Sequence, residues 1–157
     1  MYNIIDLFCG AGGFTNGFEQ TGRFKCVGAI DNNEAAVNTH DLNFKESVSV
    51  CADIRNLRPE EFNEKLNGQK VDVIIGGPPC PTFSTIGHAK IQSVQKVKGL
   101  SIEEDPRNVL FMDYLKYVAF FKPQVFVMEN VPQFLTKYKG ENFKEVKRII
   151  SRDLPEY

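Results

Sequence analysis

The sequence lacks three features that would each point to a particular class of protein. It lacks a basic excess, because its 157 residues carry a formal net charge of −1, whereas a domain that binds nucleic acid unaided normally has a clear surplus of lysine and arginine. It lacks any apolar run near the roughly 20 residues that span a bilayer. It also lacks internal repeats, low-complexity tracts and interdomain linkers. We therefore expect one soluble, cytoplasmic domain that makes no membrane contact.

The cysteines and histidines lack the spacing of metal sites and of disulfide frameworks. The four cysteines are separated by 17, 25 and 29 residues, and none of these separations is the paired spacing of a zinc site. Cys26 and Cys51 are predicted to be small buried hydrophobic side chains. His40 and His88 have no metal-ligand spacing around them, so we assign neither of them to catalysis.

Apolar segments of strand and helix character alternate along the chain. The predicted strands are 2–8, 24–30, 47–51, 71–75 and 124–128. Predicted helices follow the glycine-rich loop at 9–13, cover 34–42 and 108–121, begin at Pro59, and place Phe143, Val146, Ile149 and Ile150 on one face. Strands that alternate with helices at this pitch pair in parallel through right-handed crossovers. The pattern predicts an α/β protein with a doubly wound, mostly parallel sheet in a single domain over 1–157.

The carboxyl ends of the predicted strands deliver a set of reactive residues. In an open parallel sheet, ligands bind beyond these ends near the point where the strand order reverses. The glycine loop has the spacing Gly10-x-Gly12-Gly13-x-x-x-Gly17, which departs from the dinucleotide pattern and could be a plain tight turn. Asp31 follows the loop by about 20 residues, as an acid that binds ribose does, although it could also be a helix N-cap. Asp53 after the third strand could likewise be a turn residue, but the three together favour a nucleoside-containing cofactor.

The fourth and fifth strands end in a thiol and a carboxyl group. Cys80 follows two prolines that stiffen the chain, and 76–106 shows no sustained apolar periodicity, which is typical of a functional or disordered loop. A thiol is the best side-chain nucleophile even though only a few per cent of it is ionised at neutral pH. Glu129 follows an apolar strand, where desolvation would raise its pKa and suit it to act as a general acid. The alternative for Glu129 is a solvated carboxylate at a strand end.

Three motifs resemble those of the cytosine carbon-5 DNA methyltransferases. Asp6-Leu7-Phe8-Cys9-Gly10-Ala11-Gly12-Gly13 is similar to the family's cofactor motif, Gly77-Pro78-Pro79-Cys80 to its nucleophile motif, and Met128-Glu129-Asn130-Val131 to its acid motif. Asp53-Ile54 and Asp105-x-Arg107-x-x-Leu110-Phe111 resemble two further family segments. The order and spacing agree as well, so the resemblance covers nearly the whole chain.

The resemblance implies a covalent mechanism on double-stranded DNA. Cytosine would be flipped into the pocket and attacked at carbon 6 by Cys80, while Glu129 beside Asn130 protonates ring nitrogen 3. Carbon 5 would then take the methyl group of S-adenosylmethionine. The implied cofactor contacts are Phe8, Gly10, Ala11, Gly13, Asp31, Asn32, Asp53, Ile54, Gly77, Pro79 and Leu110. Ser84 and Arg107 would contact the substrate, in a long loop that closes over DNA.

The sequence departs from the family pattern at three places. Pro81 stands where the family usually has glutamine, so one loop hydrogen bond is expected to be lost. Asn32 replaces a common aromatic residue, which weakens stacking on adenine. The Gln-x-Arg-x-Arg segment, the target-recognition region and the C-terminal element that completes the cofactor site do not occur in the sequence. We expect a fragment, a truncated gene product or half of a split enzyme, which needs a second chain or a C-terminal region to methylate a specific sequence.

Three other functions are compatible with parts of the sequence. A tRNA cytosine-5 methyltransferase of the same lineage would use the same catalytic residues. A non-catalytic module could bind the cofactor or a partner chain only. A nicotinamide-dependent oxidoreductase would account for the glycine loop and Asp31, but it would leave Cys80 and Glu129 without a role.

Overall fold

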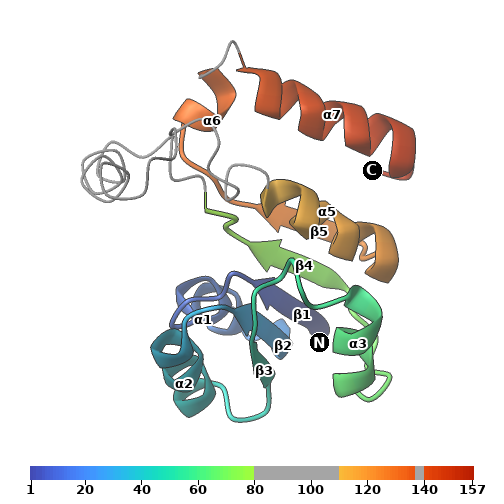
Figure 1. Ribbon diagram of the computed structural model, residues 1–157. Coiled ribbons are helices and arrows are strands. Elements are labelled where there is room, and N and C mark those ends of the chain that lie inside the picture. Colours follow the sequence, from blue (N-terminus) through green and yellow to red (C-terminus); the bar gives the residue numbers. More distant parts are fainter. Residues whose placement is uncertain (80–109, 137–139) are drawn as a thin grey trace, which may run out of the picture. The chain divides into compact units, whose positions relative to one another are not determined.

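Five parallel strands form one sheet in the order β3-β2-β1-β4-β5 (Figure 1). Their bounds are Tyr2–Leu7 for β1, Phe24–Asp31 for β2, Val48–Cys51 for β3, Val73–Gly76 for β4 and Val125–Met128 for β5. The α/β class and the doubly wound parallel sheet are thereby confirmed, and each strand begins and ends within two residues of its predicted bounds.

The computed structural model describes residues 1–79, 110–136 and 140–157 (Figure 1). These residues belong to two units, the first formed by Met1–Pro78 with Asp113–Glu129 and the second by Pro79–Met112 with Asn130–Tyr157. The single domain over 1–157 stays a prediction. Within the described ranges, no helix is both long and apolar enough to cross a bilayer.

The helices follow the strands in the alternating manner that the sequence predicts. Their bounds are Gly13–Glu19 for α1, Glu34–Asn43 for α2, Pro59–Lys65 for α3, Leu110–Phe121 for α5, Gln133–Thr136 for α6 and Glu141–Asp153 for α7. Right-handed crossovers in this strand order place α1 and α2 on one face of the sheet and α3 with α5 on the other. The sequence did not predict α6, because a helix of four residues is too short to produce a periodic apolar signal.

The core is built on both faces of the sheet. All four residues of β4 are buried, as expected of a central parallel strand covered on both faces. On the α1 face, Ile4 and Cys26 pack with further apolar residues of the sheet and of α1. On the opposite face, a Cβ added to Gly28 would lie 2.6 Å from the Leu66 side chain, so α3 packs directly on the backbone of β2. A side chain at position 28 would require the Leu66 and Phe62 side chains to move.

Two tyrosines of α5 form hydrogen bonds from this helix to the backbone of neighbouring segments. Tyr114 is fully buried, and its single hydroxyl hydrogen is shared between the carbonyl oxygens of Ile74 and Val127, each 3.1 Å from the hydroxyl oxygen. Tyr117 donates to the carbonyl oxygen of Leu57 at 2.8 Å. Each buried hydroxyl group is therefore satisfied by backbone, which lets a polar aromatic residue serve as core.

The two cysteines predicted to be buried differ from each other. Cys26 is 1% exposed, as predicted. The prediction for Cys51 is wrong, because this side chain is exposed. Cys51 is the last residue of β3, and β3 is an edge strand whose residues are at most half-buried. An apolar side chain at the end of an edge strand has no second layer to cover it.

The second unit contains α6 and α7. The rings of Phe111 and Phe134 are 5.7 Å apart and meet edge to face. On the predicted apolar face of α7, Val146 is buried, whereas Phe143 is 40% exposed. The amphipathic helix is confirmed, and part of its apolar face remains accessible within the described residues.

Candidate cofactor site at the carboxyl ends of the strands

The strand order reverses between β1 and β4, which are neighbours at the centre of the sheet. The chain leaves β1 toward β2 and leaves β4 toward β5, so the loops after these two strands diverge. In doubly wound sheets this divergence creates the crevice where ligands bind. The candidate site therefore lies where the sequence predicts it, beyond the carboxyl ends of the strands.

The glycine loop after β1 is held in an unusual backbone conformation. The backbone N–H groups of Phe8 and Cys9 both donate to the carbonyl oxygen of Ile30, at 2.8 and 3.1 Å. Phe8 has φ 67, a left-handed conformation that is rare for a bulky residue and that concentrates at functional sites. Gly12 has φ 93, and a Cβ added there would lie 2.2 Å from the Phe44 ring. Glycine at position 12 is therefore required both by conformation and by space.

Asp31 connects the glycine loop to the start of α2. Its Oδ2 atom accepts from the backbone N–H of Gly10 at 2.9 Å, and its Oδ1 atom accepts from the backbone N–H of Asn33 at 2.9 Å. The N-cap of α2 is Asn33, whose side chain accepts from the backbone N–H of Ala36. The N-cap alternative for Asp31 is therefore wrong. A carboxylate has about four acceptor positions, so Asp31 keeps positions for the two hydroxyl groups of a ribose.

The loop after β3 holds a second acid next to Asp31. The backbone N–H of Ala52 donates to the carbonyl oxygen of Asp31 at 2.9 Å, which ties the ends of β2 and β3 together. Asp53 is bound by the Arg55 guanidinium, which holds the pKa of the Asp53 carboxyl below its usual value. Ile54 is 6% exposed, whereas Asn32 is exposed. Acceptor oxygens beside a buried apolar side chain suit the edge of a nucleoside base.

Glu129 lies against the backbone that leads to the predicted nucleophile. Its N–H group donates to the carbonyl oxygen of Gly76 at 2.9 Å. A Cβ added to Gly77 would lie 3.2 Å from the Glu129 Oε2 atom. The Glu129 side chain is exposed. The structure therefore brings the predicted acid to the strand-end segment that precedes Cys80 by three residues.

The remaining predicted site residues fall into three groups. Cys80, Ser84 and Arg107, together with the predicted DNA-binding loop, are outside the described residues. Ala11 and Gly13 are exposed on the glycine loop. Pro79, Leu110 and Asn130 belong to the second unit: Pro79 is exposed, Leu110 is buried, and the Asn130 side chain accepts from the backbone N–H of Val131 at 2.9 Å.

A buried polar chain beneath the glycine loop is a feature that the sequence did not predict. The Thr15 hydroxyl group donates to Asp6 Oδ2 at 2.7 Å, and His40 Nε2 lies 3.3 Å from the same hydroxyl oxygen. Because the Thr15 hydrogen points to Asp6, Thr15 accepts from His40 Nε2. In the neutral ring, His40 Nδ1 then accepts from the Ser49 hydroxyl group at 2.9 Å. The only signal for this in the sequence is that Val37, His40 and Phe44 recur at helical spacing.

Burial controls the charge of these groups. It raises the pKa of Asp6 to about 6. It lowers the pKa of His40, which favours the neutral ring. It also raises the pKa of the Cys9 thiol well above its ordinary value, so Cys9 is inert although it lies in the loop.

The parallel sheet, the glycine loop and the acids after β2 and β3 together are the arrangement of Rossmann-like domains that bind nucleoside-containing cofactors. Residues 2–152 match the family of C-5 cytosine-specific DNA methylases. The chain therefore belongs to this family, whose methyl donor is S-adenosylmethionine.

Individual relatives agree with this assignment. The chain is 38% identical over 151 residues to the Type II methyltransferase M.DdeI of Desulfomicrobium norvegicum, a match that covers 96% of this chain and 32% of the relative. It is 36% identical over 148 residues to the Type II methyltransferase M1.HphI of Haemophilus parahaemolyticus, covering 94% and 37%. A crystal structure assigned as a DNA modification methyltransferase of an E. coli prophage is 30% identical with a TM-score of 0.77, covering 96% of this chain and 38% of that one.

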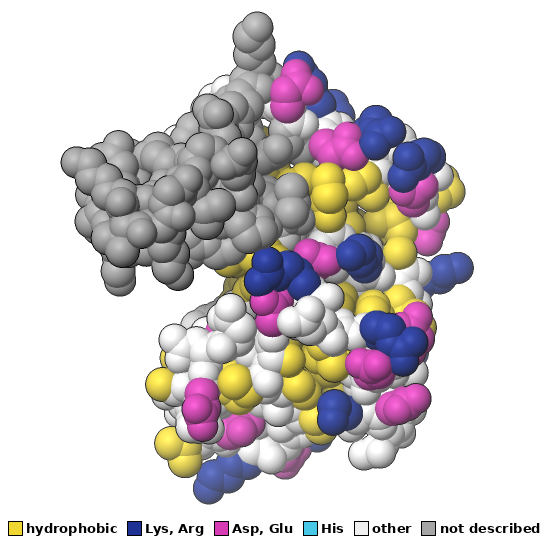
Figure 2. All heavy atoms as spheres, in the orientation of Figure 1, with side chains coloured by type: hydrophobic (Ala, Val, Ile, Leu, Met, Phe, Trp, Pro, Cys, Tyr) yellow, Lys and Arg dark blue, Asp and Glu magenta, His cyan; other side chains and the backbone are white. Residues whose placement is uncertain are grey.

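The chain thus spans about a third of the length of the curated relatives it matches. On the face that Figure 2 presents, the described lysine and arginine side chains are interspersed with aspartate and glutamate and form no single basic patch. This mixed surface agrees with the net charge of −1.

Proposed function

We propose that the chain is the cofactor-binding and nucleophile-bearing part of a DNA (cytosine-5-)-methyltransferase of restriction-modification type. The observation that carries the proposal is the hydrogen bond from Gly10 to the Asp31 carboxylate. It joins the glycine loop to the acid that follows β2, in a chain whose family transfers methyl groups to cytosine. A loop and an acid held together in this way form the frame for one end of an adenosine-containing cofactor.

The cofactor would lie along the strand ends, held by groups with complementary chemistry. The methionine and adenosine portions of the cofactor would contact Phe8, Gly10, Ala11 and Gly13. The Asp31 carboxylate would accept hydrogen bonds from the ribose. The adenine would contact Asp53 and Ile54, next to Asn32. Gly77, Pro79 and Leu110 would line the same pocket. When bound, S-adenosylmethionine supplies the electrophilic methyl group.

The protein's own residues would carry the steps on cytosine. The Cys80 thiolate forms a bond to carbon 6 of a flipped base, and Glu129, placed with Asn130, donates a proton to ring nitrogen 3. The electron pair released at carbon 5 takes the methyl group. Loss of the carbon-5 proton to a base then expels Cys80, which returns to the thiolate, and ring nitrogen 3 returns its proton to Glu129. Ser84 and Arg107 would contact the base and the DNA around it.

The partners of this function are double-stranded DNA and a region that recognises the target sequence. The matched relatives are about three times as long as this chain, and the described surface has no single basic patch on the face shown. We propose that a further C-terminal region or a second chain supplies the basic surface, and that this chain alone does not methylate a specific sequence. The function places it in the cytoplasm of a prokaryote.

The test is tritium transfer from labelled S-adenosylmethionine to DNA by the longer protein or complex that includes this chain. Cys80→Ser abolishes transfer and also the covalent trapping of a duplex that contains 5-fluorocytosine. Cys51→Ser is the matched control, because Cys51 is exposed and has no proposed catalytic role. Full activity of Cys80→Ser contradicts the mechanism. Transfer to tRNA in place of DNA moves the function to RNA, and cofactor binding without trapping reduces it to a binding module.

A further inference from the structure

Arg55 binds the Asp53 carboxylate with both its side chain and its backbone. The Arg55 Nε atom lies 2.9 Å from Asp53 Oδ1 and 3.1 Å from Oδ2, and Nη2 also contacts Oδ2. The backbone N–H of Arg55 donates to Oδ1 at 3.0 Å. One residue therefore approaches the carboxylate, which lies at the carboxyl end of β3, from two directions.

This binding leaves little room on the Asp53 carboxylate for any other donor. A carboxylate has about four acceptor positions. Arg55 fills three of them with one backbone hydrogen, one Nε hydrogen and one Nη2 hydrogen. One position remains, and because Arg55 favours the ionised form of Asp53, that position can only accept.

The backbone around Asp53 is fixed as well. The N–H group of Asn56 donates to the carbonyl oxygen of Asp53 at 2.9 Å, which closes the turn, and Ala52 is bonded to Asp31. Ile54, which lies between the two charged residues, is buried. The side chains of Asp53 and Arg55 are 26% and 41% exposed. Without the Arg55 guanidinium, water would compete for the positions it fills, and the backbone N–H of residue 55 would be the remaining described donor to the Asp53 carboxylate.

We propose that Arg55 is a positioning residue that selects the base of the cofactor. It holds the Asp53 carboxylate so that one acceptor position faces an exocyclic amino group, such as that of adenine. A keto group at the same place, as in hypoxanthine, would meet a carboxylate that has no hydrogen to donate. A site built around one such hydrogen bond rejects analogues that lack the donor. This inference rests on the proposed function, because it takes the adenosine portion of S-adenosylmethionine as the ligand.

The experiment compares two nucleoside ligands by calorimetry on the longer protein or complex that includes this chain. The ligands are S-adenosylhomocysteine and its inosine analogue, in which a keto group replaces the amino group. Arg55→Ala is expected to weaken binding of the adenosine ligand about tenfold, the loss of roughly one well-oriented hydrogen bond to a charged group. Binding of the inosine analogue changes far less, so the preference between the ligands shrinks. Arg55→Lys restores part of the preference, because the lysine ammonium group keeps the positive charge but cannot donate two parallel hydrogen bonds to the carboxylate as a guanidinium does.

Two further comparisons separate positioning from a general effect on the fold. Arg58→Ala is the matched control, because Arg58 forms a similar ion pair with Glu61 near the start of α3 and does not bind Asp53. It is expected to leave both affinities unchanged. Combining Arg55→Ala with Asp53→Asn is expected to cost little more than Asp53→Asn alone, because Arg55 acts through Asp53.

The outcomes that overturn the inference are distinct from those that overturn the proposed function. Equal weakening of both ligands by Arg55→Ala, no weakening, tighter binding, or additive effects in the double variant each contradict the positioning role. If Arg55→Ala does not fold, Arg55→Lys and Arg55→Gln provide the same comparison. Failure of the unmodified longer protein or complex to bind either ligand contradicts the proposed cofactor site itself, and the inference is lost with it.

Discussion

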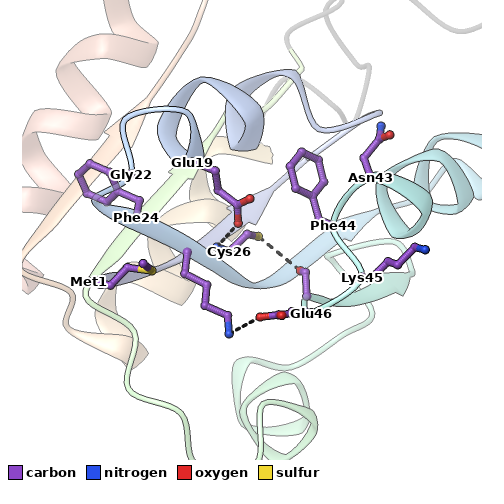
Figure 3. Close-up of a pocket in the computed structure, with 11 residues that line it drawn as sticks. Met1, Glu19, Gly22, Phe24, Cys26, Asn43, Phe44, Lys45 and Glu46 are labelled. Atoms are coloured by element: carbon purple, nitrogen blue, oxygen red, sulfur yellow. Dashed lines mark hydrogen bonds and ion pairs between the residues drawn. The ribbon is translucent and has the colours of Figure 1, made fainter.

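The carboxyl and amino ends of β2 and β3 both hold charged side chains, but the groups are arranged for different purposes. At the amino ends, residues from the end of α1, the start of β2 and the segment after α2 line a pocket of about 340 Å³ (Figure 3). Three of its charged side chains already have partners: Lys25 lies 2.6 Å from Glu46, and Glu19 accepts from the backbone N–H of Cys26 at 2.7 Å. Burial raises the pKa of the Cys26 thiol to about 11, which makes it unreactive.

At the carboxyl ends, the acids hold the backbone and keep acceptor positions for a ligand. Asp31 receives one backbone hydrogen on each oxygen. Phe8 adopts a left-handed conformation that no strand or helix requires. The amino-end pocket is concave and yet its thiol is unreactive, so a concave surface does not by itself identify the site. The site lies where backbone strain, unfilled acceptor positions and the reversal of strand order coincide.

The largest expected loss of stability comes from a substitution at the carboxyl ends of the strands, where a side chain would have to fill the space at Gly12. Gly12→Val forces a branched side chain into φ 93 and against Phe44, so we expect a loss of about 3 kcal/mol in the free energy of unfolding. Urea denaturation measures it. Gly17→Ala is the matched control, because Gly17 lies in α1 with nothing within 4 Å of an added Cβ. Equal losses in the two variants would show that the loop is not constrained as described.

The second prediction concerns the buried acid beneath the loop. Because burial raises the pKa of Asp6 to about 6, the folded protein binds more protons than the unfolded chain between the two pKa values, and stability falls as pH rises from about 4 to 6. The loss is about 3 kcal/mol, and Asp6→Asn removes it because an amide does not titrate there. Urea denaturation at several pH values in this window measures the slope. The same pH dependence in the unmodified chain and in Asp6→Asn would disprove the assignment of this slope to Asp6. Glu46→Gln, at the amino end, is the control and is expected to keep the slope of the unmodified chain.

The third prediction concerns the affinity of the carboxyl-end site for its ligand. Asp31→Ala removes the acceptor for both ribose and Gly10, so we expect the affinity for S-adenosylhomocysteine to fall roughly 30-fold or more. Calorimetry measures this fall, with thermal melting as a check on folding. Glu46→Gln changes a carboxylate of the amino-end pocket and is expected to leave the affinity unchanged. A similar fall in both variants would remove the distinction between the two ends.

The smallest effect is expected at the amino end itself. Lys25→Ala removes the ion pair with Glu46, whose side chain is 78% exposed. Exposed pairs of this kind contribute little to stability, and salt screens them. We expect a small loss of stability at low salt that disappears at high salt, measured by urea denaturation at two ionic strengths. A loss that persists at high salt would indicate that the Lys25 stem packs in the pocket.

Most of the fold could be predicted from local pattern. Apolar runs of β-branched residues alternate with amphipathic segments, and this alternation permits few arrangements other than parallel strands joined by right-handed crossovers. Asp31 and Asp53 could be placed together for the same reason, because neighbouring parallel strands end at one edge. Cys51 could not be predicted, because its burial depends on whether β3 is a central or an edge strand.

The site was predicted in outline and not in its supporting contacts. Asp31 was identified as a candidate acid, but only the structure shows that Asn33 and not Asp31 caps α2. The Asp53-Ile54-Arg55 segment contains an acid and a base two residues apart, yet this spacing alone does not indicate whether the two side chains meet. The role of Cys80 stays a prediction, since it lies outside the described residues.

The sequence by itself determined the class of fold, the family and the strand ends at which the acids lie. These follow from short-range pattern and from motifs, which need no knowledge of distant contacts. Only the tertiary structure decided that Asp6, Thr15, His40 and Ser49 form one buried chain, and that Arg55 fills most of the Asp53 carboxylate. Hydrogen bonds depend on distance and direction between particular atoms, and those are established only when β1, α1, α2 and β3 pack together.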